Sequence, residues 1–519
     1  MPLGTPGCDI SALLRRYLAD VSGLSQKTQP LAATFTRLSS PAFLPRSHHT
    51  LTIVGGKGYI WGGYDADGNM AGTDMHIVQL PVKSKGKGTG DGEVEYKVVP
   101  ALGEGQEVEQ EDEKLQVQGG GEIPAARADH AAFTIGELVY VFGGTDSEMQ
   151  VLEEKGRVWV FNTTSLHWSF LDPESGTSYP SARYQHGAAA SEHPLPPGNP
   201  NSPASTYKES ITNTLAKVPS LIGKTTTETK PHGTLIICSG LASLDSTSAL
   251  TDMWTFDIAS RTWTSLPSLP STADISAPPS VALTHNRLYA IASSSSNVGS
   301  ELLYLPLPKS SFYSHTTSAA AADPNSSANL QPMFSGAEKP VSEKKGEWAT
   351  LPFPTNPLAP GPRPRKGAGL VPITTGNGRE YLLYFFGQRL PTSNDNLTSP
   401  TSTSPPPPST DTGDEPLYWS DIWSYQTPAV AATASGIKDA TRSSLGIATG
   451  EGTWAEVKVV ADVEETHGGE ETEGKSHPGP RGWFAGGGVD GSGVVMWGGR
   501  NGKGETEGDG WVVRVKTDS

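Results

Sequence analysis

A Gly-Gly pair recurs directly after short apolar runs, and this repeat constrains the fold more than any other feature of the sequence. Complete pairs stand at Gly62–Gly63, Gly143–Gly144 and Gly498–Gly499, with partial matches at Ser239–Gly240 and Gly387–Gln388. Glycine permits backbone turns and close backbone approaches that a Cβ would prevent. One such unit cannot bury its own apolar face, so repeated units stack against one another. The sequence therefore predicts a molecule built from similar modules.

Most units also have a basic start and an aromatic strand. The starts contain Arg46, Arg127, Arg183, Arg365 and Arg481, three of them joined by His48, His49, His130 and His186. The strand after the Gly pair carries Trp159, Trp254, Trp423 or Trp511, and a further aromatic often follows at Trp168, Trp263, Trp348 or Trp454. Each unit reads as four short strands separated by turn residues. The Trp side chains are expected to fill the space between neighbouring units.

This pattern resembles the kelch repeat of the galactose oxidase/kelch-like propeller superfamily, in a fungal-type form. The resemblance implies an all-β fold, a six-bladed β-propeller. Unit four is the weakest, since Pro278–Ala282 leads to Leu288–Ala292 without a Gly pair; five or seven blades therefore stay open. The last unit lacks its fourth strand. We expect the segment around residues 33–38 to supply it and close the ring, which removes exposed sheet edges.

The repeat predicts one propeller over residues 31–519 after an N-terminal extension, residues 1–30. The pairs at 62, 143, 239, 292, 387 and 498 lie farther apart than the about 50 residues of one kelch unit, except 239 and 292. The excess predicts disordered inserts at 82–122, 192–231, 309–346, 390–416 and 462–479, because their polar composition cannot offset the entropy of ordering. Apolar residues at helical spacing predict a short amphipathic helix over Ile10–Leu24.

Composition excludes several functional classes. The net charge of −16 argues against binding to nucleic acid or to an anionic membrane surface. No apolar run is long enough for a transmembrane helix, and no signal peptide is recognisable. With only two cysteines, Cys8 and Cys238, a disulfide framework or a cysteine metal site is not expected. These observations predict a monomeric cytoplasmic protein, with access to the nucleus possible.

Candidate chemistry is sparse. A copper–radical oxidase site, which some kelch propellers carry, needs a Cys–Tyr pair that neither cysteine offers. The iron site of the similar nitrile-specifier proteins needs a Glu, an Asp and a His at four-residue spacing, which the chain lacks. The blade-start histidines His48, His49, His130 and His186 are assigned a structural role, with convergence on the channel as the alternative. We therefore expect no catalytic residue, cofactor or metal.

These considerations favour a non-enzymatic scaffold that binds other proteins through propeller loops, as the kelch resemblance also implies. The alternative is a metal-dependent, specifier-like or small-molecule-binding enzyme at one mouth of the channel. The loops after the Gly pairs are the predicted partner-binding elements: Tyr64, Asp65, Asp67, Thr145, Asp146, Gln388, Arg389, Arg500 and Asn501. The predicted structural repeat comprises Gly62, Gly63, Gly143, Gly144, Gly240, Gly387, Gly498, Gly499, Trp159, Trp254, Trp423 and Trp511.

Overall fold

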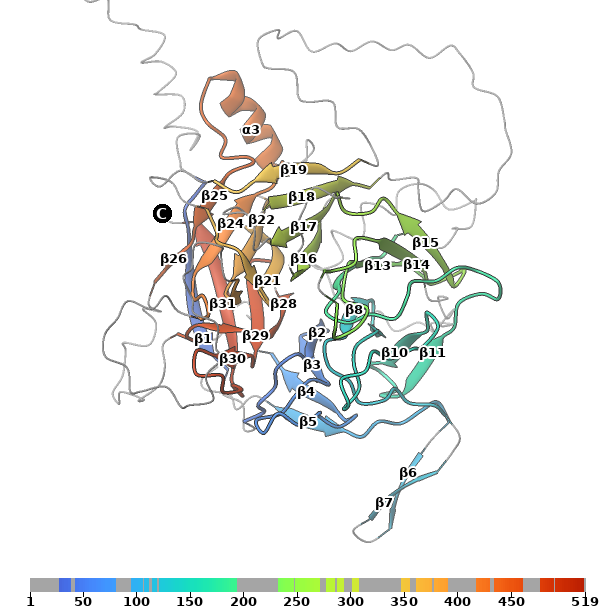
Figure 1. Cartoon of the computed structure of the whole chain (residues 1–519). Coiled ribbons are helices and arrows are strands. Elements are labelled where there is room, and N and C mark those ends of the chain that lie inside the picture. Colours follow the sequence, from blue (N-terminus) through green and yellow to red (C-terminus); the bar gives the residue numbers. More distant parts are fainter. Residues whose placement is uncertain are drawn as a thin grey trace, which may run out of the picture.

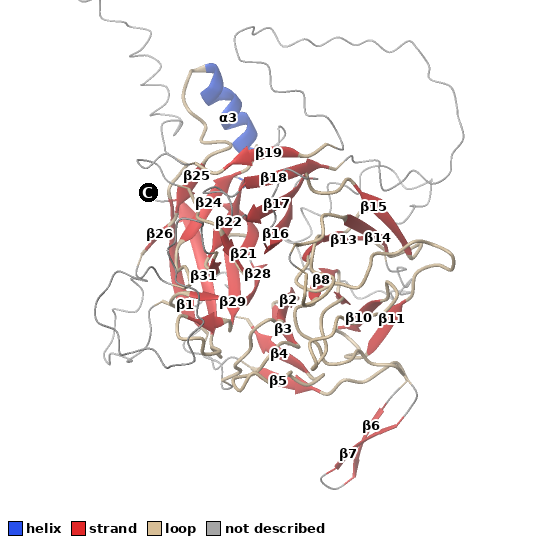
Figure 2. Ribbon diagram, in the orientation of Figure 1, coloured by secondary structure: helices blue, strands red, loops and turns tan. Residues whose placement is uncertain are grey.

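Short apolar runs that are separated by turn-forming glycines fold into strands. Each run buries one or both of its faces, and the chain then reverses direction at the turn. In β8 (Ala131–Ile135), buried and half-buried residues alternate. The chain then turns at Gly136, whose φ is +59°, into the almost fully buried β9 (Leu138–Phe142). Repetition of such hairpins gives the computed structural model of this protein its all-β character (Figure 2).

The described part of the chain covers the propeller strands and most of their connections. It comprises residues 28–38, 43–80, 95–105, 107–111, 114–118, 121–193, 232–246, 248–270, 277–284, 287–293, 301–307, 347–354, 361–375, 378–390, 417–429, 434–460, 477–489 and 491–517.

Five four-stranded sheets, each with its strands in chain order, and one five-stranded sheet surround a common centre (Figure 1). Blade one holds β2 (Thr50–Val54), β3 (Lys57–Trp61), β4 (Met75–Gln79) and β5 (Tyr96–Val99); blade two holds β8, β9, β10 (Val158–Asn162) and β11 (Trp168–Leu171). Blade three holds β12 (Gly187–Ser191), β13 (Thr234–Cys238), β14 (Met253–Asp257) and β15 (Thr262–Leu266); blade four holds β16 (Ala277–Thr284), β17 (Arg287–Ser293), β18 (Glu301–Pro306) and β19 (Ala349–Pro352). Blade five holds β21 (Gly369–Thr375), β22 (Arg379–Phe385), β24 (Ile422–Gln426) and β25 (Trp454–Glu456).

Blade six confirms the predicted closure. It holds β28 (Ala485–Val489), β29 (Gly493–Trp497) and β31 (Gly510–Thr517), and its outer strand is β1 (Leu31–Arg37) from the other end of the described chain. β1 pairs with β31 antiparallel from Leu31↔Thr517 to Arg37↔Trp511 (Figure 1). The parallel strand β26 (Lys458–Val459) covers the far edge of β1. The innermost strands contact one another in the cyclic order β2, β8, β12, β16, β21, β28, so the ring has six blades and unit four forms a true blade.

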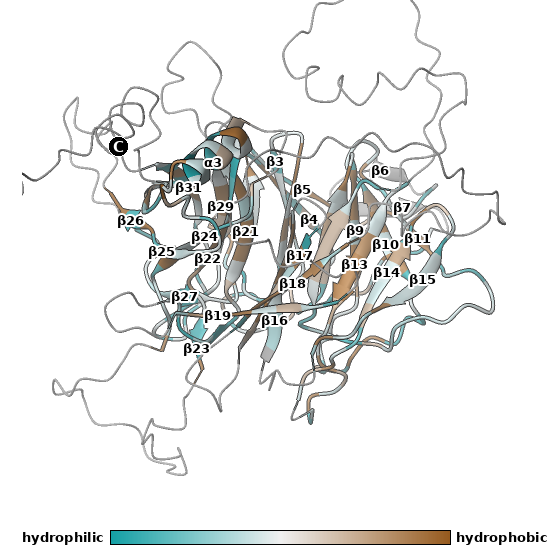
Figure 3. Cartoon of the chain, turned by 90° about the horizontal axis from the view of Figure 1, so that it is seen from above, coloured by the Kyte–Doolittle hydropathy of each residue, from teal (hydrophilic) through white to brown (hydrophobic). Residues whose placement is uncertain are grey.

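The core is divided among the blade interfaces. Each pair of neighbouring blades encloses one cluster of buried apolar residues, and six such clusters surround the ring. The cluster between blades five and six contains Leu31 and Phe35 of β1 beside Tyr381 and Trp511. Figure 3 shows the apolar colouring concentrated in strands such as β13. β1 therefore supplies core surface as well as hydrogen bonds.

Two short two-stranded sheets lie at the ends of blades five and six. β20 (Arg365–Lys366) pairs with β23 (Gln388–Arg389), and β27 (Arg481–Gly482) pairs with β30 (Arg500–Asn501). Both join the start of a blade to the loop after its Gly pair. None of the described helices is long and apolar enough to cross a membrane.

The structure differs from the sequence analysis in the first insert. The prediction that 82–122 is wholly disordered is wrong, because β5 (Tyr96–Val99) is the fourth strand of blade one and pairs with β4. A hairpin of β6 (Glu107–Glu111) and β7 (Lys114–Gln118) follows and projects away from the blades (Figure 1). The predicted helix at Ile10–Leu24 and most of the other four inserts lie outside the described residues.

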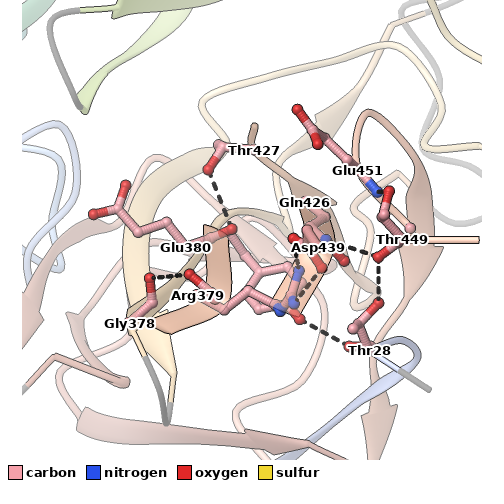
Figure 4. A network of polar contacts seen from close by, with 12 residues as sticks. Thr28, Gly378, Arg379, Glu380, Gln426, Thr427, Asp439, Thr449 and Glu451 are labelled. Atoms are coloured by element: carbon pink, nitrogen blue, oxygen red, sulfur yellow. Dashed lines mark hydrogen bonds and ion pairs between the residues drawn. The ribbon is translucent and has the colours of Figure 1, made fainter. Parts of the chain in front are cut away.

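Helix α3 (Ala434–Ser444) was not predicted, and its buried face is polar. Its buried residues are Ser435, Asp439 and Arg442, whereas Ile437 is exposed. The Arg379 guanidinium donates to both Asp439 carboxylate oxygens at 2.6 and 2.7 Å, which attaches α3 to blade five (Figure 4). A pattern of buried apolar residues, the usual signal of a helix, is absent here.

Candidate functional site

Buried arginines fix the start of four blades. Each guanidinium forms an ion pair with an acidic residue beside the third strand of its own blade and donates to a carbonyl of the Gly-pair turn. The same acid accepts a hydrogen bond from a Trp indole at 2.7–2.9 Å. The sets are Arg127–Glu154–Trp159, Arg183–Asp252–Trp254, Arg365–Asp421–Trp423 and Arg481–Asp509–Trp511. In blades two, three, five and six, the blade-start arginine therefore pairs with an acid of its own blade.

The Gly pairs lie against the starts of blades. A Cβ on Gly62 would lie 2.5 Å from the Arg127 carbonyl oxygen and 2.8 Å from the His130 ring, both in the next blade. The second glycine meets its own blade, since a Cβ on Gly63 would lie 2.6 Å from that of His49. All the predicted glycines have positive φ. The pair therefore lets two blade starts pack on one turn.

A backbone belt connects five blade starts at one end of the ring. Its residues all have left-handed φ of 52–60°: His48, Asp129, Gln185, Gly367 and Trp483. The amides of four of them donate to the carbonyl of the belt residue in the preceding blade, with N–O distances of 2.8–3.0 Å. The links are Trp483→Gly367, His48→Trp483, Asp129→His48 and Gln185→Asp129. The end of the propeller that carries this belt is called the belt face below.

Blade four interrupts the belt. Its residue at this position is Pro279, which has no N–H and cannot adopt a positive φ. The carbonyl of Pro279 lies near Gly187 instead. Consequently the carbonyl of Gln185 and the N–H of Gly367, on either side of the break, have no hydrogen-bond partner among the described residues.

A cavity of about 270 Å³ lies inside the belt. All six blades line it, with the belt side chains at its rim and the blade-start residues below them. Pro278, Val281 and Leu370 provide apolar wall. This channel-mouth cavity is a small, mixed polar and apolar site of the kind that binds ligands.

The rim side chains are connected to one another. His48 Nδ1 lies 2.6 Å from Asp129 Oδ1, and the Gln185 amide donates to the same oxygen at 3.2 Å. The His48 ring stacks on Trp483 with a centroid distance of 4.5 Å, and the Lys366 ammonium lies 5.8 Å from the Trp483 ring centre. Asp129 is therefore hydrogen-bonded within the rim, whereas Lys366 forms no ion pair among the described residues.

Three blade-start imidazoles line the cavity together. This arrangement agrees with the alternative that these histidines converge on the channel. His49, His130 and His186 are 92–94 % buried. Burial, together with nearby arginines, lowers the pKa of His49 and of His186 to about 3 and that of His130 well below its usual value. The rings are neutral at pH 7. His130 Nε2 lies 2.9 Å from the Thr50 hydroxyl, but both ring nitrogens of His49 and of His186 lack a partner among the residues that the structure describes.

The donor set does not fit a metal. No three His, Cys, Asp or Glu side chains within the described residues are placed to hold one ion. The nearest carboxylate, Asp129, is bonded to His48 and Gln185 instead. Neither the copper site nor the iron site that kelch-like enzymes suggest has its ligands here.

The predicted partner-binding loops lie on the belt face. In blades one and two, loop residues pair with the blade starts in the bridges Ser47↔Tyr64 and Ala128↔Thr145. In blades five and six, they do so in the two-stranded sheets that pair Lys366 with Gln388 and Gly482 with Arg500. Several of their polar side chains serve the loops themselves. Asp65 and Asp146 each accept two backbone N–H bonds of their own turn, as does Asn501. Asp67 is exposed, and Arg389 is half-buried.

Sequence reasoning did not single out the belt. Asp129, Gln185, Gly367 and Trp483 differ in chemistry, so no residue type repeats at this position. The signal that marks them is positional: each stands two residues after the blade-start arginine and directly before the residue that lines the cavity. Pro279 at the same position would have indicated the break.

Comparison with known proteins identifies the repeat in one blade. The Kelch motif family matches residues 126–173, which span blade two. No curated protein matches the chain. A solved structure titled "Structure of YjhT" is 12 % identical, and the alignment covers 92 % of this chain and 99 % of that chain with a TM-score of 0.44. This likeness carries no argument about function, and none of the matches bears on a fungal-type subclass.

Proposed function

We propose that this chain, which carries a kelch motif and folds as a six-bladed β-propeller, is a non-enzymatic scaffold that binds proteins through its belt face. The main support is that the loops after the Gly pairs are both clustered on that face and held by hydrogen bonds. Binding by loops that are already ordered loses less conformational entropy than binding by loops that must first become ordered.

The side chains available on this face suit protein recognition. Tyr64 and Arg500 stand at equivalent positions of blades one and six, and Trp483 lies at the rim beside them. Tyr, Trp and Arg are the residue types that most often dominate binding energy at protein interfaces. Tyr64 packs edge-on against His48, which fixes its ring.

The proposal includes the setting of the interaction. The partner is a protein, the propeller acts as a monomer in the cytoplasm with access to the nucleus, and neither nucleic acid nor a membrane is bound. The net charge of −16 supports the exclusion of polyanionic partners.

The test compares capture of partners by two doubly substituted chains. Tyr64→Ala/Arg500→Ala alters two loops on the belt face. Lys57→Ala/Arg261→Ala alters two turns at the opposite end of the propeller. Tagged proteins are incubated with native extract, and bound proteins are quantified by mass spectrometry. We expect the belt-face variant to capture at least about tenfold less of a specific partner protein than wild type, because hot-spot residues supply most of the binding energy. Equal capture by wild type and both variants would contradict the proposal.

A further inference from the structure

The channel-mouth cavity contains polar groups that the fold itself leaves unused. Within the described part of the chain, the Gly367 N–H has no partner because Pro279 interrupts the belt, and Lys366 is the cation next to it. Both line the cavity. A buried polar group without a partner costs free energy, so a site that retains several of them is suited to a ligand that would satisfy them.

Lys366 differs from the four buried arginines at the blade starts. Arg127, Arg183, Arg365 and Arg481 each form an ion pair with a carboxylate of their own blade. Lys366 is half-buried, and burial lowers the pKa of its ammonium. The described residues give it no carboxylate, so an anion bound in the cavity would stabilise its charge.

The imidazoles add directional donors and acceptors. A neutral imidazole has one N–H donor and one acceptor nitrogen. His186 is 8 % exposed and His49 is 6 % exposed, and neither ring forms a hydrogen bond to any described residue. Both rings line the same cavity as Lys366. A ligand oxygen there can therefore accept from ring N–H groups as well as from the backbone.

We propose that the channel-mouth cavity is a carboxylate-binding site, with the Lys366 ammonium and the Gly367 N–H as the groups that hold the anion. A carboxylate matches this arrangement because its two oxygens accept hydrogen bonds and its charge complements the ammonium. The about 270 Å³ of space admits a small acid or an acidic side chain. A ligand cation is disfavoured, since Asp129 is already engaged by His48 and Gln185. This site does not depend on the scaffold proposal, because Tyr64 and Arg500 are not among its lining residues.

The experiment measures binding of three probes to the full chain by saturation-transfer NMR and calorimetry. Benzoate represents a free carboxylate, a capped peptide with a single Glu represents a carboxylate carried by a partner, and inorganic phosphate represents another anion. Lys366→Met removes the charge but keeps the length of the side chain, and Lys97→Met removes an exposed lysine from β5 as the matched control. Lys366→Gln replaces the Met variant if that variant does not fold.

We expect benzoate or the Glu peptide to bind wild type and Lys97→Met with equal affinity, and Lys366→Met at least about tenfold more weakly. Tighter binding of the peptide than of benzoate would assign the site to a partner's acidic side chain, and the reverse to a free acid. The proposal is overturned if neither carboxylate binds wild type at about 20 mM, a concentration that detects even weak sites. It is also overturned if Lys366→Met binds as wild type does, or if phosphate binds more tightly than both carboxylates.

Discussion

At the scale of single residues, the first glycine of a pair and the histidine of the next blade are coupled. Gly62 lies against the ring of His130, and Gly143 lies against the ring of His186. Where the next blade starts with Ser280 or Phe484 instead of His, the first glycine is replaced by Ser239 or Phe386, which keep the left-handed φ. The imidazole, packed edge-on against Trp61 or Phe142, therefore needs the space of the missing Cβ.

Gly62→Ala is expected to destabilise the protein more than Gly68→Ala. Both residues have positive φ, +68° and +79°, so alanine costs about 1 kcal/mol at either from backbone strain. Only Gly62 has neighbours within contact distance, at 2.5 and 2.8 Å, and overpacking adds about 1–3 kcal/mol. Chemical denaturation of both variants measures the difference. An equal loss of stability in the two variants would show that the His130 ring can move away from an added Cβ at no cost in free energy.

At the scale of elements, closure of the ring depends on a strand brought from the other end of the described chain. β1 contributes seven paired positions to blade six and three buried residues, Leu31, Ala33 and Phe35, to the core between blades five and six. A polar element strengthens the same region, since Thr28 Oγ1 donates to the Thr449 carbonyl beyond α3 (Figure 4).

Deletion of residues 31–39 is expected to lower the melting temperature by at least about 10 °C, because blade six loses its outer strand and exposes the edge of β31. Deletion of residues 107–118, the projecting β6–β7 hairpin, is the control and should change it by only about 2 °C. Differential scanning calorimetry provides the comparison. A deletion of 31–39 that melts with the wild type would refute the role of β1 in closure.

At the scale of the whole molecule, the belt end of the propeller concentrates neutral imidazoles and paired guanidinium groups around one cavity. The folded pKa of His49 and of His186 is lowered from 6.5 to about 3, mainly by burial. The unfolded chain therefore binds these protons at a higher pH than the folded chain. The stabilising contribution is complete above pH 6.5 and is lost progressively as the pH falls from 6.5 towards 3.

The free energy of unfolding is expected to decrease on acidification below pH 6.5, by up to about 1.4 kcal/mol per pH unit for each of these histidines. His186→Gln should reduce that slope, because the amide does not titrate. Denaturation at pH 7, 6, 5 and 4 measures the slopes. A His186→Gln slope that equals the wild-type slope would contradict the assignment.

The sequence by itself determined the architecture. Gly pairs, blade-start arginines and Trp positions recur along the chain because every blade meets the same neighbours, so the six blades and the closing strand could be predicted. The first insert was predicted less well: β5 is only four residues long, two of them are exposed, and it forms a strand by pairing with β4.

Only the tertiary structure decided where the site lies and what is unsatisfied there. The belt links residues of unlike chemistry through their backbones, and a backbone hydrogen bond leaves no residue type in the sequence. That His49 and His186 meet Lys366 in one cavity depends on the curvature that brings blades one, three and five around a common axis. The polar buried face of α3 likewise follows from Arg379, which lies on another strand. The repeat can be recognised in the sequence because each unit is a local segment of the chain. The convergence of side chains from distant units depends on closure of the ring.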